Sequence, residues 1–191
     1  MSVLSGPEIK RRIFEEKDIN RRLVVSPLLE PDNQIQAGSC SIDVRLGTRF
    51  ILQNRINVTS LSPVSTPAGG LGSIQIPVTV PIGKRLALHP NQFVLGGTLE
   101  YIGMPLDLAG YVIGRSSWGR LGLIVATAIG IHPGYKGIIT LELTNMGEVP
   151  IFLYPGETLA QIFLHTIEGG VSEIGVVSRY IGAAYPESAC K

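Results

Sequence analysis

The sequence predicts a mainly β protein of the barrel or jelly-roll kind, and three observations support this prediction. From Leu86 onward, short apolar runs rich in Val, Ile and Leu follow one another closely. Turn-forming segments such as HPNQ, MPLD, HPGYKG, NMGEVP and YPGE separate those runs. The 191 residues also include 23 glycines and 13 prolines, which suits a chain with many tight turns.

The first expected element is a helix near the N-terminus. Ser5 and Glu8 have the spacing of a capping box, in which the two side chains bond to each other's backbone N–H groups. The apolar residues that follow recur at helical spacing, namely Ile9, Ile13 and Phe14. A loop rich in Pro, Asp and Asn is expected to continue from this helix to about Gly38.

The strands are expected to begin with CSIDVRLGTRFIL, because apolar and polar residues alternate along it. Residues 54–83 mix short apolar runs with Pro and Gly, which indicates a loop or hairpin. The later strands are predicted at residues 85–89, 92–102, 109–114, 122–128, 137–145, 150–154 and 159–167. We expect a single domain over residues 1–191, with a helix and loop over 1–37 and a tail over 171–191.

The composition narrows the class of function. Hydrophobic residues make up 45% of the chain, so it can bury a core without disulfides. The net charge of +1 gives no reason to expect a nucleic-acid partner, and no apolar run is long enough to span a membrane. The two cysteines, Cys40 and Cys190, lie far apart, and the N-terminus lacks a signal-peptide pattern. A cytoplasmic protein is the expectation.

Glu142 lies inside the predicted strand GIITLELTN, where a carboxylate is disfavoured by strand propensity. One interpretation is that the strand has a solvated face, as antiparallel strands often do. The other is that the carboxylate points into a pocket, where desolvation would raise its pKa and allow proton transfer near neutral pH.

The segment GRSSWGRLG brings Arg115, Ser116, Ser117 and Arg120 close together. Backbone N–H groups, two hydroxyls and a guanidinium can together bind a phosphate chain, although an ordinary basic turn has the same spacing. His132 lies in a Pro-Gly turn, where it is either a solvated turn residue or a proton carrier. Neither the zinc-deaminase signature nor a serine-nucleophile elbow is present in the sequence.

Taken in order, SIDVRLG, GRSSWGRLGL, TA, HPGYKGIITLEL and LYPGETLAQIF resemble the dCTP deaminase branch of the dCTP deaminase/dUTPase superfamily. The resemblance implies a distorted jelly-roll core and a homotrimer with active sites between subunits, each covered by the C-terminal tail. It implies deamination of dCTP to dUTP and ammonia without zinc. It also implies that Mg²⁺ is bound through the triphosphate rather than by protein side chains, and that dTTP is a candidate inhibitor.

The resemblance also assigns roles to single residues. Glu142 matches the proton-transferring glutamate, while Ser116 and Arg120 match the residues that orient the water and stabilise the charged intermediate. The remaining matched positions are expected to bind phosphates (Arg115, Ser116, Ser117 and Gln161), the pyrimidine (Thr127, Ala128, Thr140 and Leu141), the deoxyribose (His132 and Tyr135) or, from the tail, the nucleotide (Arg179 and Tyr180).

Two departures from the family pattern matter: the first, at His132 and the loop before it, argues against phosphate hydrolysis and leaves the exact base specificity open, and the second lies in the tail. Most relatives carry Asp where this chain has His132, and a histidine replaces a carboxylate base poorly in phosphate hydrolysis. The preceding loop is one residue shorter than in common deaminases, and the tail lacks a glutamine-rich end. The alternatives are a dUTP diphosphatase, a bifunctional enzyme that releases dUMP, and a regulator that binds deoxynucleotides without turning them over.

Overall fold

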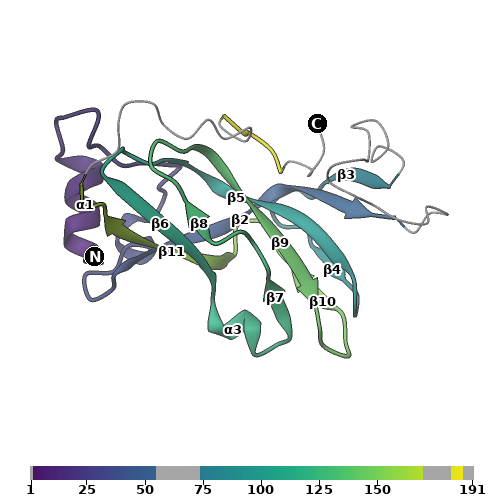
Figure 1. The fold of residues 1–191 in the computed structure, drawn as a ribbon. Helices are drawn as coiled ribbons and strands as arrows, with labels where there is room; N and C mark the ends of the chain where they lie inside the picture. Colours follow the sequence, from purple (N-terminus) through teal and green to yellow (C-terminus); the bar gives the residue numbers. More distant parts are fainter. Residues whose placement is uncertain (1, 55–73, 170–181, 187–191) are drawn as a thin grey trace.

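The computed structural model describes residues 2–54, 74–169 and 182–186, which form a mainly β structure with three short helices (Figure 1). Every predicted run after Leu86 contains a strand, so the predicted fold class is confirmed. The helices are α1 (Gly6–Phe14), α2 (Pro31–Gln34) and α3 (Ser116–Gly119). The strands are β1 (Val24–Ser26), β2 (Ser41–Gln53), β3 (Gln75–Thr79), β4 (Leu86–Leu88), β5 (Phe93–Gly103), β6 (Leu108–Gly114), β7 (Leu123–Val125), β8 (Gly130–Ile131), β9 (Lys136–Asn145), β10 (Ile151–Leu153) and β11 (Thr158–Thr166).

Strand β2 connects the two halves of the large sheet, whose order is β7-β9-β5-β2-β11-β6-β8. Its first residues pair with β11, from Ser41 to Arg45, and its later residues pair with β5 and β3. Within the loop or hairpin predicted over residues 54–83, β3 forms and pairs with β2, and residues 55–73 lie outside the described part. Strand β1 pairs with β5, and β4 and β10 form a separate two-stranded sheet.

The core lies between the inward faces of these strands. The alternation predicted for β2 is observed, because Val44 is buried while its neighbour Asp43 is only half-buried. Strand β9 alternates in the same way, with Leu141 buried and Glu142 half-buried. Burying such apolar side chains stabilises the fold by about 1.5 to 3 kcal/mol each. The largest fully buried side chains are Phe50, Ile9, Leu23, Ile35, Ile42, Leu46, Leu88, Ile102, Leu108, Leu141, Leu143 and Leu153.

Helix α1 forms where the sequence predicts it, but the predicted capping box is wrong. The Ser5 side chain makes no capping hydrogen bond. The Glu8 carboxylate instead accepts two 2.8 Å hydrogen bonds from the guanidinium of Arg11. Ile9 and Ile13 are buried, whereas Phe14 is 55% exposed and does not belong to the buried face.

The long loop expected before Gly38 contains β1 and α2, which the sequence did not indicate because elements of three and four residues have no measurable period. Helix α2 matters for the site, since its last residue, Gln34, is buried against β2. In the parts of the chain that the structure describes, no helix has the length and apolar character needed to cross a membrane.

Candidate active site

Glu142 lies on β9, and the loop after β7 is bonded to its backbone on both sides. The N–H of Glu142 donates to Oγ1 of Thr127 at 2.9 Å, and the N–H of Ala126 donates to the carbonyl oxygen of Glu142 at 2.8 Å. Thr127 is buried, whereas Ala128 is exposed. Among the described residues, none forms a hydrogen bond or ion pair with the Glu142 carboxylate. The half-buried carboxylate is therefore available beside a loop in which Ala126 and Ala128, on either side of Thr127, are exposed.

The segment predicted to bind an anion begins where β6 ends, and two consecutive carbonyl groups of β11 hold it. The N–H of Arg115 donates to the carbonyl oxygen of Leu159 at 3.0 Å, and Nε1 of Trp118 donates to that of Thr158 at 2.9 Å. These carbonyls lie at a β-bulge, where β11 shifts register against β2 between Thr158 and Ala160. The bond to Leu159 continues the β6–β11 pairing one residue beyond Gly114, whereas the carbonyl oxygen of Thr158 is bound by the Trp118 side chain.

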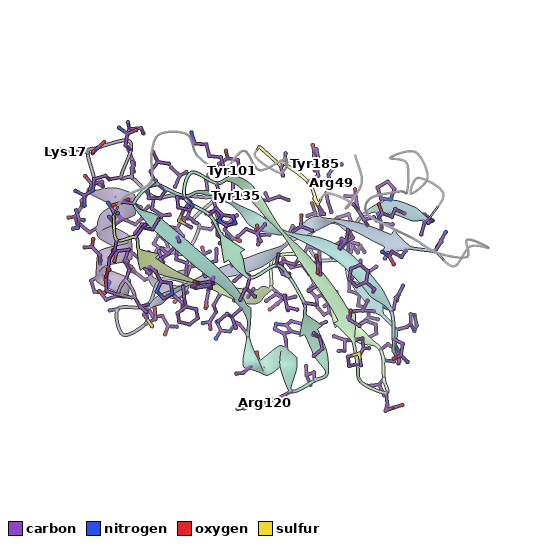
Figure 2. The ribbon with its side chains drawn as sticks, in the orientation of Figure 1. Lys17, Arg49, Tyr101, Arg120, Tyr135 and Tyr185 are labelled. Atoms are coloured by element: carbon purple, nitrogen blue, oxygen red, sulfur yellow. The ribbon has the colours of Figure 1, made fainter. Side chains whose placement is uncertain are left out.

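Trp118 is the side chain of α3 that packs against the core, and its polar neighbours face solvent. Ser116, Ser117 and Arg120 are exposed, and no described residue is bonded to their side chains. Figure 2 shows Arg120 at the lower edge of the molecule, beside α3. Two hydroxyls and a guanidinium are thus available to a ligand that carries negative charge.

Arg115 and Gln161 are brought together by Asp43, which sequence reasoning placed only on the polar face of β2. Asp43 and Gln161 face each other across the β2–β11 ladder, and Nε2 of Gln161 donates to Oδ1 of Asp43 at 2.9 Å. Nη1 of Arg115 donates to the other oxygen, Oδ2. The alternation of β2 indicated the face on which Asp43 lies, but its partners depend on strand register, which the sequence does not reveal.

A small polar cleft opens next to this cluster and encloses about 240 Å³, including space open to solvent. Residues from the loop around α2, from β2, from the start of α3 and from β11 line it: Asn33, Gln34, Gln36, Ser39, Ser41, Asp43, Arg115 and Gln161. Within the described ranges, no group of three or more His, Cys, Asp or Glu side chains could hold a metal ion.

The predicted sugar-binding residues lie in the turn between β8 and β9. His132 is exposed, and its carbonyl oxygen accepts a 3.2 Å hydrogen bond from the N–H of Tyr135. The Tyr135 ring packs against the core, and its hydroxyl donates to the carbonyl oxygen of Ile138. His132 is thus accessible, while Tyr135 presents a fixed ring rather than a free hydroxyl. Of the predicted base-binding strand residues, Thr140 is half-buried and Leu141 is wholly in the core.

The single chain does not bring all these residues to one place. Figure 2 shows Arg120 at the lower edge, whereas Tyr135 lies in the upper half of the molecule. The structure joins Glu142 to Thr127, and Arg115 to Gln161, as two separate clusters. Arg179 and Tyr180 of the predicted tail lie outside the described residues.

A described part of the tail, residues 182–186, lies along the start of β9. The N–H of Ile138 donates to the carbonyl oxygen of Ala183 at 2.9 Å, and Ala183 is buried. The guanidinium carbon of Arg49 lies 4.0 Å from the ring centroid of Tyr185, which is a cation–π contact (Figure 2). This segment is therefore fixed on the strand that carries Glu142.

Comparison with known proteins gives a consistent result. A family model described as dCTP deaminase-like matches residues 3–167. A protein named dCTP deaminase from Halorubrum lacusprofundi is 43% identical over 161 residues, which is 84% of this chain and 75% of that protein. One named "dCTP deaminase, dUMP-forming" from Dictyoglomus turgidum is 40% identical over 166 residues, covering 86% of this chain and 80% of that protein.

Among solved structures, a 2′-deoxycytidine 5′-triphosphate deaminase from Agrobacterium tumefaciens superposes with a TM-score of 0.62 at 22% sequence identity. The match covers 85% of this chain but only 46% of that protein, so the chain spans just under half of its length. At this identity the likeness concerns the fold alone. The family match over most of the chain, together with relatives near 40% identity, shows that the chain belongs to the dCTP deaminase-like family.

Proposed function

We propose that this chain is a hydrolase that deaminates dCTP to dUTP and ammonia without zinc. The observation that carries the proposal is the carboxylate of Glu142, which is half-buried, lacks a protein partner among the described residues and lies beside the loop around Thr127. Family membership supplies the substrate, since relatives near 40% identity are named dCTP deaminases.

In the proposed reaction, Glu142 takes a proton from a water molecule whose oxygen attacks C4 of the cytosine ring. The bond from C4 to the exocyclic amine then breaks as Glu142 delivers this proton to the departing amine, and the second proton of the water passes to N3 of the ring, so that dUTP and ammonia are the products. Ser116 orients the water, and Arg120 stabilises the charge that develops on the intermediate. Both side chains are exposed and free of described partners, which supports their availability.

The triphosphate, with its Mg²⁺, is proposed to bind along the segment that starts at Arg115. The hydroxyls of Ser116 and Ser117 and the guanidinium of Arg115 are suited to phosphate oxygens, because charge-assisted hydrogen bonds to anions are strong. Gln161 lies in the same cluster through Asp43. Mg²⁺ enters this scheme as part of the substrate, held by the phosphates.

The base is proposed to lie between the loop at Thr127 and Ala128 and the backbone of β9 at Thr140 and Leu141. His132 would bond the sugar 3′-hydroxyl, for which either ring nitrogen is suitable. The Tyr135 ring, fixed by its bond to Ile138, would leave no room for a 2′-hydroxyl.

We further propose that the whole of residues 1–191 acts as one domain within a homotrimer, with each site formed between subunits and covered by the 171–191 tail. The separation of Arg120 from Tyr135 within one chain supports a shared site (Figure 2). Arg179 and Tyr180 would then contact the nucleotide from the tail. A cytoplasmic location and inhibition by dTTP are also proposed; the free, exposed thiol of Cys40 is consistent with a reducing compartment.

A second candidate function is a bifunctional reaction that continues from dUTP to dUMP and pyrophosphate. It is favoured by the relatives named "dCTP deaminase, dUMP-forming", at 40% identity over 166 residues in one case. His132 speaks against it, because a histidine is a weaker substitute for the carboxylate base expected at that position. Incubation with dCTP and with dUTP, followed by separation of dUTP, dUMP and pyrophosphate, distinguishes the two.

The decisive experiment is Glu142→Gln, which keeps the shape of the side chain but removes its proton-accepting charge. We expect dCTP binding to persist and ammonia release to fall by at least ~10²-fold, the lower range for one general acid–base group. Glu148→Gln is the matched control, because Glu148 is exposed in the turn after β9. Undiminished turnover in Glu142→Gln would exclude Glu142 from the mechanism, and a wild-type protein that binds dCTP without releasing ammonia would favour the regulator.

A further inference from the structure

Asp43 presents an apparent conflict, because a carboxylate lies inside a cluster that is proposed to bind phosphate. Its side chain is 13% exposed, and it accepts hydrogen bonds from Nη1 of Arg115 and from Nε2 of Gln161. If its only effect were electrostatic, it would repel the triphosphate and compete for Arg115. The geometry points to a different role.

We propose that Asp43 is a positioning residue that holds Arg115 and Gln161 in the orientation that binds the triphosphate; this inference rests on the proposed function. An arginine has five N–H donors, so the bond through Nη1 leaves others free for phosphate oxygens. The Arg115 side chain is still 37% exposed while it is paired with Asp43. The pair therefore orients the guanidinium without covering it.

The three side chains come from neighbouring strands of one sheet. Asp43 and Gln161 are directly opposite each other on β2 and β11, and Gln161 is opposite Ile113 on β6. Arg115 follows Ile113 by two residues, which places it on the same face of the sheet. Ordering a long side chain on binding costs conformational entropy, and a fixed neighbour that orders the side chain beforehand removes that cost.

The backbone of Asp43 is itself bound by a buried polar network. Nε2 of Gln34 donates to the carbonyl oxygen of Asp43 at 3.2 Å and to Oε1 of Glu100 at 3.0 Å. Glu100 is fully buried and pairs with Arg45, two residues after Asp43 on β2, at 2.6 Å. Its second oxygen accepts the N–H of Arg45 at 2.8 Å. The backbone beneath Asp43 is thus fixed at a carbonyl and at a neighbouring N–H, as a positioning residue requires.

The test uses inorganic triphosphate as the probe, so that binding is measured without deamination. Asp43→Asn removes a negative charge. Its amide N–H group would also face one of the two present donors, Nη1 of Arg115 or Nε2 of Gln161, so that hydrogen bond is lost. If Asp43 positions its partners, triphosphate should bind about tenfold more weakly by calorimetry, the effect of losing a charge-assisted hydrogen bond. If Asp43 only competes for Arg115, the same variant should bind more tightly, so the sign of the change decides.

Asp32→Asn is the control for bulk charge, because Asp32 is exposed on α2 and pairs with Lys10 rather than with Arg115. In an Arg115→Ala background, Asp43→Asn should weaken binding much less, since the residue acts largely through Arg115. Arg115→Lys supplies a variant that leaves β2 intact. Lysine keeps the positive charge but has no planar group that can donate to Asp43 and to a phosphate at the same time. The affinity of Arg115→Lys for triphosphate should therefore also fall about tenfold.

With dCTP as substrate, Asp43→Asn should raise KM about tenfold and change kcat little, because phosphate binding far from C4 is lost equally in the ground and transition states. Unchanged or tighter triphosphate binding by Asp43→Asn overturns the inference but not the proposed function. If Asp43→Asn does not fold, unchanged triphosphate binding by Arg115→Lys has the same consequence. A wild-type protein that does not bind triphosphate overturns both the inference and the proposed phosphate site. Weakened triphosphate binding in a protein that releases no ammonia supports the inference and overturns the proposed reaction.

Discussion

Replacing Glu100 by Gln should destabilise the fold strongly, because its buried carboxylate is the counter-ion of the mostly buried guanidinium of Arg45. The Glu100 side chain has no exposed surface, and its carboxylate accepts hydrogen bonds from Nε2 of Gln34 at 3.0 Å and from N and Nε of Arg45 at 2.8 and 2.6 Å. All three partners are donors. A glutamine amide at this position would point its own N–H groups at a donor and would leave the Arg45 charge, 12% exposed, without a counter-ion.

Removing one partner of a buried ion pair costs about 3 to 5 kcal/mol. For a chain of this size each kcal/mol lowers Tm by about 2 to 4 °C, so Glu100→Gln should lower Tm by roughly 6 to 20 °C. The assay is thermal unfolding by circular dichroism at one fixed protein concentration, since association makes Tm depend on concentration. Because Gln34 links Glu100 to Asp43, the variant should also weaken triphosphate binding.

Two further variants make the measurement interpretable. Asp32→Asn removes a carboxylate that is 95% exposed and pairs with Lys10, and it should change Tm little. The double variant Glu100→Leu with Arg45→Met removes both charges and should recover part of the lost stability. A decrease in Tm of less than about 2 °C for Glu100→Gln would refute the reasoning. It would mean that removing the counter-ion of Arg45 costs no more than breaking a solvent-exposed ion pair.

Single contacts lead to three other predictions. Gly6→Ala should lower the free energy of unfolding, measured in urea, by about 1 to 3 kcal/mol. The reason is that a Cβ at this position would lie 2.2 Å from the backbone carbonyl oxygen of Gln36, in the loop after α2. An unchanged unfolding midpoint would show that this loop can move aside. Tyr185→Ala removes the ring over which Arg49 lies and should speed proteolysis of the C-terminal segment, whereas an unchanged cleavage rate would mean that the backbone bonds suffice. Arg11 donates hydrogen bonds to Glu8 and lowers the pKa of that carboxyl below its ordinary 4.5. The wild-type protein should therefore have a higher Tm than Glu8→Gln above pH 4.5, and the difference should shrink as pH falls below that value. An equal difference in Tm at neutral and low pH would contradict this.

The sequence is most informative where a regular period runs for several residues. The alternation along β9 suffices to place Leu141 in the core and Glu142 on the opposite face, because side chains of a strand alternate between faces. The turn signals likewise separate the later strands correctly. The helix that starts after Ser5 is also predicted, but the predicted capping box is wrong, because Glu8 instead pairs with Arg11.

The sequence is least informative about contacts between distant segments. Nothing near Asp43 indicates that its partners are Arg115, 72 residues away, and Gln161, 118 residues away. Nothing near Glu100 distinguishes an exposed strand carboxylate from one with no exposed surface. Such contacts are fixed by strand register and crossover, which depend on the whole sheet rather than on any local pattern.

The β-bulge in β11 ties together two segments that are far apart in the chain. The carbonyl oxygens of Thr158 and Leu159 accept hydrogen bonds from Trp118 and Arg115, so this strand holds the start of the turn that is proposed to bind phosphate. Hydrogen bonds within the turn, such as that from the N–H of Arg120 to the carbonyl oxygen of Ser116, shape the turn but do not attach it to the sheet. A designer who moves the turn to another sheet therefore has to move the irregular strand with it.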